Sequence, residues 1–290
     1  MKDVFNRKWI IEQSLEVLPN YDYGVLTLRG LFYQLVARGM TNSQRHYKRV
    51  GAAMTAARRN GLVSFDAFSD HDREMLGRTM GYTTEVESAV DHAKDQIEAW
   101  FNYYTKNRWE NQPYHPEIWI EKKALQGVFR PITMEYDVAL AACKGYPSLT
   151  FLNEAAQRFQ EVIDKGAIPL ILYFGDYDAT GEDIPRSIAA NLKEDFGINI
   201  EMARIGLHLE QVLQLNLPPA PTKTSDSRAK NWEGIGQVEL DAVNPNTIQQ
   251  WARDAIEDYF DQDLYDELKE QEVEERQQYK RQLQEHFNRQ

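Results

Sequence analysis

Cysteine and long apolar runs are nearly absent from this chain of 290 residues. Cys143 is the single cysteine, so a disulfide framework and a zinc site made of several thiolates are excluded. No run approaches the roughly 18 continuous apolar residues of a membrane span. The first residues, MKDVFNRKWIIEQSLEVL, read as an amphipathic helix with acids rather than as a signal peptide. We therefore expect a cytoplasmic protein with no membrane partner.

Glycine-rich phosphate loops are also missing. Neither a G-x-x-x-x-G-K-[ST] loop nor a G-x-G-x-x-G loop occurs in the sequence. The six histidines do not have the spacing of metal ligands. We therefore expect no ATPase activity on this chain and no nucleotide cofactor.

Acidic residues are absent from one part of the chain and concentrated in another. The formal net charge is −12, which by itself disfavours nucleic acid as a partner. Residues 24–64, however, contain no Asp or Glu, whereas residues 251–275 are rich in both. The acid-free stretch carries Arg29, Arg38, Arg45, Lys48, Arg49, Arg58 and Arg59. A basic segment suited to phosphate contacts is thus joined to an acidic chain.

The first hundred residues have the apolar spacing of helices. We expect helices over about 3–18, 27–38, 43–60 and 84–105, and a short strand at LVSFDAF, residues 62–68. A helix, a turn, a second helix rich in Arg and Lys and then a hairpin-like strand are typical of a winged helix-turn-helix. Residues 1–108 are therefore predicted to form a helical, CAP-like DNA-binding domain.

From Pro116 onward, strand and helix patterns alternate. The strand candidates are EIWIE, YDVALAAC, AIPLILYF and INIEMARIGL, and helical segments lie between them, the last at IPRSIAANLKEDFG. This rhythm predicts an α/β fold in which residues 109–245 form a Rossmann-like domain with a parallel sheet. Residues 246–290 are predicted to be an acidic helical C-terminal region.

Three carboxylates follow predicted strands. Glu121 ends one strand, and Asp176 and Asp178 follow another in YFGDYDATGED. Ligands of parallel sheets gather beyond the carboxyl ends of the strands, and residues two apart in extended chain project the same way. Carboxylates this close repel unless a cation or protons neutralise them. The pattern predicts a Mg²⁺ site made by these three residues, with a phosphate completing the coordination.

The segment DYDATGED has two other interpretations. As a calcium loop it fails, because the twelfth position is Ser187 instead of Glu and Pro185 interrupts it. As a plain polar turn it would cap the next helix, since acids are favoured at helix N-termini.

The segments IWIEK, KGYPS and YFGDYDATGEDI together resemble the Toprim domain. Among Toprim proteins, the chain resembles the DNA-cleaving subunit of topoisomerase VI and its relatives, the meiotic double-strand-break transesterase and the phage and bacterial Topo mini-A proteins. Those proteins place a winged-helix domain with a nucleophilic tyrosine before the Toprim domain, and this chain has the same order. The resemblance covers about residues 20–245. It departs at Gly30, where relatives usually have Asp, and at Ala179, where topoisomerase VI usually has Pro.

The resemblance also identifies a candidate nucleophile in TLRGLFYQLVARG. The family pattern is an Arg, three residues and then a Tyr that is the second of two aromatics, which here are Arg29 and Tyr33. Helical spacing independently places these two residues four apart on the flank of an apolar stripe. There, Arg29 would stabilise a phenolate and bind the phosphate under attack. Without the resemblance, a half-buried structural tyrosine is the simpler interpretation.

The resemblance implies Mg²⁺-dependent cleavage and religation of double-stranded DNA by tyrosine transesterification, with Tyr33, Arg29 and Glu121 in catalytic roles. It also implies a homodimer, possible partnership with a separate ATPase protein, association with the nucleoid and an origin in a phage or mobile element. We expect the predicted second helix of the DNA-binding domain to contact phosphates through Arg45, Lys48, Arg49 and Arg59.

Two other functions stay open at this point. A Toprim nuclease would cut DNA with metal-activated water and leave Tyr33 as a structural residue, an option that Gly30 favours. A DNA-binding module without turnover would use the acidic C-terminal region to hold a partner.

Overall fold

The computed structural model describes residues 4–68, 85–219, 234 and 236–288. The chain divides into two compact units, Met1–Asp72 with Tyr114–Tyr259 and Arg73–Pro113 with Phe260–Gln290. The division into three domains made from the sequence stays a prediction.

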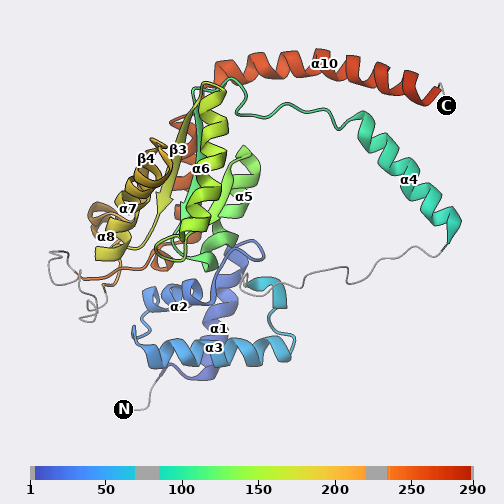
Figure 1. Ribbon diagram of the computed structural model, residues 1–290. Helices are drawn as coiled ribbons and strands as arrows, with labels where there is room; N and C mark the ends of the chain where they lie inside the picture. Colours follow the sequence, from blue (N-terminus) through green and yellow to red (C-terminus); the bar gives the residue numbers. More distant parts are fainter. Residues whose placement is uncertain (1–3, 69–84, 220–233, 235, 289–290) are drawn as a thin grey trace. The chain divides into compact units, whose positions relative to one another are not determined.

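The first unit begins with three helices, α1 (Arg7–Val17), α2 (Leu28–Ala37) and α3 (Gln44–Arg59), close to the predicted bounds (Figure 1). Each helix has a polar N-cap of the preferred type, since Asn6, Thr27 and Ser43 accept a hydrogen bond from a backbone N–H of the first turn. The apolar stripes of the helices meet in one core that includes Ile10, Leu26, Leu31, Leu35, Val50 and Met54.

The prediction of a short strand at residues 62–68 is wrong. The segment contains a 3-10 turn, η2 (Phe65–Ala67), and Ser64 caps it by accepting from the backbone N–H of Asp66 at 3.2 Å. The alternation of apolar residues that indicated a strand instead lets Val63, Ala67 and Phe68 cover the helical core. A hairpin that continued into residues 69–84 would lie outside the described residues.

The α/β prediction is confirmed in the rest of the first unit. Four parallel strands form one sheet in the order β2-β1-β3-β4. The strands are β1 (Tyr114–Ile120), β2 (Ala139–Ala142), β3 (Ile168–Phe174) and β4 (Glu201–Gly206). The two central strands are almost fully buried, which agrees with their continuous apolar sequences.

Helices cover both faces of this sheet. On one face, α6 (Leu149–Asp164) and α7 (Ala179–Phe196) enclose a core with Trp119, Ile171 and Tyr173 of the central strands. Helices α5 (Gln126–Tyr136) and α9 (Pro245–Glu257) pack against each other, and Phe129 of α5 meets Phe174 of β3 with ring centroids 4.7 Å apart. A short helix, α8 (Leu209–Gln214), follows β4, and a 3-10 turn, η5 (Leu240–Ala242), precedes α9.

The second unit contains α4 (Val86–Phe101) and α10 (Gln262–Asn288). Trp109 packs edge-on against Phe260, with centroids 5.2 Å apart. Glu272 is buried, and it is neutralised by Lys269 and Arg276 and accepts from the backbone N–H of Lys106. The predicted C-terminal helices are thus present, one in each unit. Among the described residues, no helix has the length and apolarity needed to cross a membrane.

Candidate active site

Two of the three predicted carboxylates meet at the carboxyl edge of the sheet. Glu121 follows β1 and Asp176 follows β3, and these strands are hydrogen-bonded neighbours. The backbone N–H of Glu121 donates to the carbonyl of Phe174 at 2.9 Å, which continues the ladder past the last strand residue. The backbone N–H of Asp176 in turn donates to Glu121 Oε2 at 3.0 Å. Parallel pairing therefore brings together two residues that are 55 positions apart.

Asp178, the third predicted ligand, is engaged as a helix cap. Its side chain accepts from the backbone N–H of Gly181 at 2.7 Å, and helix α7 begins at Ala179, five residues before the predicted start. The interpretation of DYDATGED as a capping turn is thus correct for Asp178. In the described part of the chain, no group of three or more His, Cys, Asp or Glu side chains is arranged to hold a metal ion.

Lys122 supplies the positive charge at this edge. Its Nζ lies 2.7 Å from Asp176 Oδ2, 3.3 Å from Asp241 Oδ2 and 3.6 Å from Glu239 Oε2. Glu239 and Asp241, which flank Leu240 in VELDAV, were not predicted from the sequence. The only signal available was a pair of acids alternating with apolar residues, which is common in solvated turns.

The backbone around these two acids is held in place. Val238 and Tyr177 exchange both backbone hydrogen bonds, at 2.8 and 3.0 Å. The backbone N–H of Leu240 donates to Asp176 Oδ1 at 2.8 Å. The segment with Glu239 and Asp241 is therefore fastened to the loop that carries Asp176.

Burial and mutual repulsion shift the ionisation of the carboxylates. Desolvation, with repulsion from Asp176, raises the pKa of Glu121 to about 7. Desolvation also raises the pKa of Asp176, although Lys122 opposes the shift. Burial alone would lower the pKa of Lys122, but attraction to Asp176, Asp241 and Glu239 outweighs it and raises that pKa. A half-buried lysine thus stays charged because carboxylates surround it.

Helix α2 is attached to the same segment. The hydroxyl of Thr27 accepts from the backbone N–H of Gly30 at 2.8 Å and donates to Asp241 Oδ1 at 3.0 Å. Arg29 forms an ion pair with Glu239, and the Tyr33 hydroxyl lies 3.5 Å from Glu239 Oε2. Burial, with repulsion from Glu239, raises the pKa of Tyr33 to about 12. The structure thus brings Arg29 and Tyr33 to the acids at the edge of the sheet.

The close approach of α2 explains the glycine at position 30. A Cβ there would lie 3.1 Å from Leu26 Cδ1 and 3.3 Å from Thr27 Oγ1, and 3.9 Å from the carbonyl oxygen of Asp241. An Asp at this position, usual in the family that the sequence resembles, would crowd the cap and add a carboxylate beside Asp241. The glycine therefore matches the local packing of this chain.

The surroundings of Glu121 fit a small hard cation. The Tyr173 hydroxyl is buried and has no hydrogen-bond partner among the described residues. A Cβ at Gly175 would lie 2.8 Å from this hydroxyl and 3.0 Å from Glu121 Oε2, so the glycine keeps space open between them. Mg²⁺ is commonly held by one or two carboxylates with several waters, and Glu121 with Asp176 provides that number.

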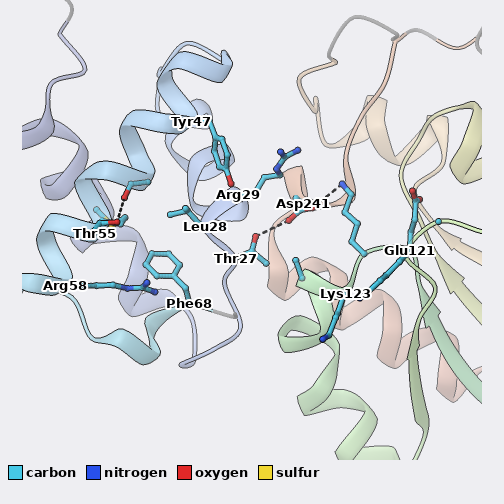
Figure 2. Close-up of a pocket in the computed structure, with 16 residues that line it drawn as sticks. Thr27, Leu28, Arg29, Tyr47, Thr55, Arg58, Phe68, Glu121, Lys123 and Asp241 are labelled. Carbon is cyan, nitrogen blue, oxygen red and sulfur yellow. Dashed lines mark hydrogen bonds and ion pairs between the residues drawn. The ribbon is translucent and has the colours of Figure 1, made fainter. Parts of the chain in front are cut away.

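A cavity of about 840 Å³ opens beside these residues (Figure 2). Arg58 of α3 and Phe68, which follows η2, lie on one side in this view, and Glu121, Lys123 and Asp241 lie on the other. The Arg58 guanidinium is 4.7 Å from the centroid of the Phe68 ring. The cations that line the cavity are Arg29, Arg58, Lys122, Lys123 and Lys144, and the acids are Glu121 and Asp241.

The four predicted DNA-binding residues do not line this cavity. Arg45, Lys48 and Arg49 gather around a separate shallow hollow on α3. Arg59 lies in a further hollow, together with Arg7. Arg58, which was not among the predicted DNA-binding residues, is the residue of α3 whose charge reaches the large cavity. Arg58 lies seven residues after Gly51 and eleven after Tyr47, which also line the cavity. This helical spacing places the three residues on one face of α3, and it was the sequence signal that could have identified Arg58.

Comparison of the chain with family models, curated proteins and solved structures gave no match.

Proposed function

We propose that this chain is a Mg²⁺-dependent DNA transesterase similar to the DNA-cleaving subunit of topoisomerase VI, with a winged-helix domain and a Toprim domain. The observation that carries the proposal is the packing of helix α2, with Arg29 and Tyr33, against acids at the carboxyl edge of a parallel sheet. Arg29 and Tyr33 contact Glu239, and Lys122 links Glu239 to Asp176, one of the three predicted acids.

In the proposed reaction, the Tyr33 oxygen attacks a backbone phosphorus of DNA. A phosphorus–oxygen bond to Tyr33 forms and the bond to the 3′ oxygen breaks, which leaves a 5′ phosphotyrosine and a free 3′ hydroxyl. The reverse attack by the 3′ hydroxyl religates the strand without any other energy source. Arg29, next to the tyrosine, would bind the phosphate oxygens and the charge that develops on them.

Glu121 and Asp176 would hold the magnesium ion, with Asp178 beside them as the third residue of the proposed set. When bound, the ion supplies positive charge that stabilises the transition state and the departing 3′ oxygen. As an alternative to binding the ion, Glu121 would suit proton transfer, because without the ion its pKa of about 7 lets the carboxyl group both accept and donate a proton near neutral pH.

The proton of Tyr33 needs an acceptor, since a phenol with a pKa of about 12 is almost wholly neutral at pH 7. In the chain without DNA, the carboxylate nearest to the hydroxyl is that of Glu239, at 3.5 Å. In the proposed reaction, Glu121 in its proton-transfer role would be the acceptor. The raised pKa of Tyr33 favours a second candidate function, a Toprim nuclease in which water replaces Tyr33 as the nucleophile.

Covalent trapping separates the two functions. The chain is incubated with supercoiled plasmid and Mg²⁺, denatured, and assayed for protein attached to 5′ DNA ends. We expect adducts with the unaltered chain and none with Tyr33→Phe, because phenylalanine has no oxygen to attack phosphorus. Tyr23→Phe is the matched control, since Tyr23 is exposed and lies in the turn that precedes α2.

The outcomes differ clearly. Cleavage that persists in Tyr33→Phe but is lost in Asp176→Ala would assign the nuclease. DNA binding that needs no Mg²⁺ and produces no cleavage in any variant would contradict both enzymes and support a binding module.

The proposed partners are double-stranded DNA, a second copy of the chain and a separate ATPase protein, and the proposed location is the nucleoid. Arg45 and Lys48 are exposed on α3 and share one hollow with Arg49, which supports a role in phosphate contacts. Arg59 would add a contact from its own hollow.

A further inference from the structure

Two cations converge on a single carboxylate beside Tyr33. Arg29 pairs with Glu239 through its guanidinium, and Lys122 Nζ lies 3.6 Å from Glu239 Oε2. The same Oε2 atom is the one closest to the Tyr33 hydroxyl. A planar guanidinium and an ammonium that share one anion beside a hydroxyl form a binding arrangement for any oxyanion of suitable size.

We propose that Arg29 and Lys122 form a binding site for one phosphate of DNA, and that the Glu239 carboxylate occupies this site until DNA displaces it. The inference rests on the proposed function for the class of its ligand, a phosphodiester. It adds a residue, Lys122, that binds the phosphate, and a residue, Glu239, that competes with it.

The side chain of Glu239 can leave while its backbone stays. The flanking residues Val238 and Leu240 are fixed by hydrogen bonds to Tyr177 and Asp176. The Glu239 side chain is 27% exposed, and that of its partner Arg29 is 42% exposed. Rotation of one side chain toward solvent would free the two cations without breaking the attachment of this segment.

Asp241 behaves differently although it touches the same lysine. Its side chain is 2% exposed, and Thr27 and Lys122 both bind it. It therefore holds Lys122 in position and attaches α2, whereas Glu239 is the carboxylate that an incoming anion can replace.

The cavity next to this site favours a polyanion over a single small anion. Arg58, Lys123 and Lys144 line it in addition to Arg29 and Lys122. A nucleic acid strand has several phosphates in a row, so it can occupy the site made by Arg29 and Lys122 and contact the other cations at the same time. This extended contact would offset the loss of the ion pairs made by Glu239.

The test measures binding without cleavage. A short fluorescein-labelled DNA duplex is titrated with the full chain in the presence of a chelator, and anisotropy gives Kd at several salt concentrations. We expect Glu239→Gln to lower Kd about tenfold, because the competing charge is removed while both cations stay. The slope of log Kd against log salt concentration should become steeper by about the amount that one phosphate contact contributes.

Glu135→Gln is the matched control. It removes the same charge from an exposed ion pair with Arg253 in the same unit, and we expect its Kd to stay within about twofold of the unaltered chain. Adding Arg29→Gln to Glu239→Gln should cancel the gain in affinity, because one of the two cations is then missing.

An unchanged or higher Kd for folded Glu239→Gln would overturn the inference, as would an equal gain for Glu135→Gln. If Glu239→Gln does not fold, Glu239→Asp decides: its carboxylate is retracted by one methylene, so tighter binding supports the site and unchanged binding overturns it. The binding titration measures no cleavage, so it is independent of the covalent trapping experiment. If trapping yields covalent adducts but the titration shows none of the expected changes in Kd, the transesterase proposal stands and the phosphate site is rejected. If the titration shows the expected changes in Kd but trapping yields no adducts, the phosphate site stands and the transesterase proposal is rejected.

Discussion

At the scale of single residues, Lys122 shows how one charge holds the candidate site together. Three carboxylates, from Asp176, Glu239 and Asp241, lie within 4 Å of its ammonium group. Removing one partner of a buried ion pair leaves uncompensated charge, which typically costs more than the pair itself contributes.

Lys122→Met should therefore destabilise the chain by about 3 kcal/mol at neutral pH in the absence of divalent cations. Added Mg²⁺ should restore part of this loss, since a cation bound near Asp176 replaces the missing charge. Urea unfolding with and without Mg²⁺ measures both effects. Lys94→Met is the control, because its pair with Asp91 is exposed on both sides and should change stability by less than about 1 kcal/mol. A Lys122→Met chain as stable as the control would show that the acids do not repel one another.

Cys143 reports on the same edge of the sheet. Its thiol is buried, and its backbone N–H donates to the carbonyl of Ile120 at 2.8 Å. Burial raises the pKa of this thiol to about 12, so very little reactive thiolate exists at pH 8.

We expect the folded chain to react with a disulfide reagent such as DTNB at least roughly 10³ times more slowly than the chain in guanidinium chloride, where the thiol has an ordinary pKa. Because the folded-state pKa lies far above neutrality, the native rate should rise about tenfold per pH unit between pH 7 and 9 while the fold stays intact. Since Cys143 is the only cysteine, the absorbance of the released thiolate needs no further assignment. A native rate close to the denatured rate would show that this edge of the sheet is open.

At the scale of elements, the start of α7 depends on one glycine. A Cβ on Gly181 would lie 2.2 Å from the carbonyl oxygen of Asp176, a distance that atoms without a bond between them do not adopt. The backbone of the Asp176 loop would have to move, together with the hydrogen bond from Gly181 to Asp178.

Gly181→Ala should therefore cost about 2–3 kcal/mol of stability, in the range of overpacked cores, and should weaken the proposed Mg²⁺ binding through the displaced loop. Gly51→Ala makes the same change inside helix α3, where the new Cβ would be 3.5 Å from Leu28 Cδ2, an ordinary contact. It should be neutral or stabilising by up to about 1 kcal/mol. Thermal unfolding of the two variants compares them directly, and equal effects would contradict the close approach at Gly181.

The elements predicted from the sequence were those whose signal is local. Apolar runs identified the buried strands, and the apolar period identified the first helices, whose N-caps in the structure include Thr27 and Ser43. The strand at 62–68 failed because alternating apolar residues also suit a capped 3-10 turn. The start of α7 was missed because the acids before it were interpreted as metal ligands, although one of them is the N-cap.

The candidate site was predictable only in part for the same reason. Glu121 and Asp176 follow the carboxyl ends of two strands. Because the carboxyl ends of parallel strands lie at the same edge of a sheet, the sequence indicated that these two residues are close together. Glu239 and Asp241 belong to no regular pattern, and their role arises from contacts with residues more than 100 positions away, such as Lys122 and Arg29. Contacts of this kind depend on how helix α2 packs, which apolar spacing does not specify.

At the scale of the whole molecule, the proposed homodimer determines which tyrosine acts with which acids. In the relatives that the sequence resembles, the tyrosine of one subunit meets the metal site of the other. In this chain the Tyr33 hydroxyl reaches Glu239 of its own chain, a contact that the inferred displacement of Glu239 by DNA would release. We therefore expect catalysis between subunits, with the contact inside one chain belonging to the state without DNA.

Mixing two inactive variants tests this arrangement. Tyr33→Phe lacks the proposed nucleophile and Asp176→Ala lacks a proposed metal ligand, and each alone should form no adduct. After the two are mixed and allowed to exchange subunits, a mixed dimer has one complete site between subunits, made of Tyr33 from one copy and Asp176 from the other. It should therefore nick plasmid and form covalent adducts without making double-strand breaks, which gel electrophoresis distinguishes. If the sites were complete within one chain, each copy in a mixed dimer would still lack one group, and mixing would restore nothing.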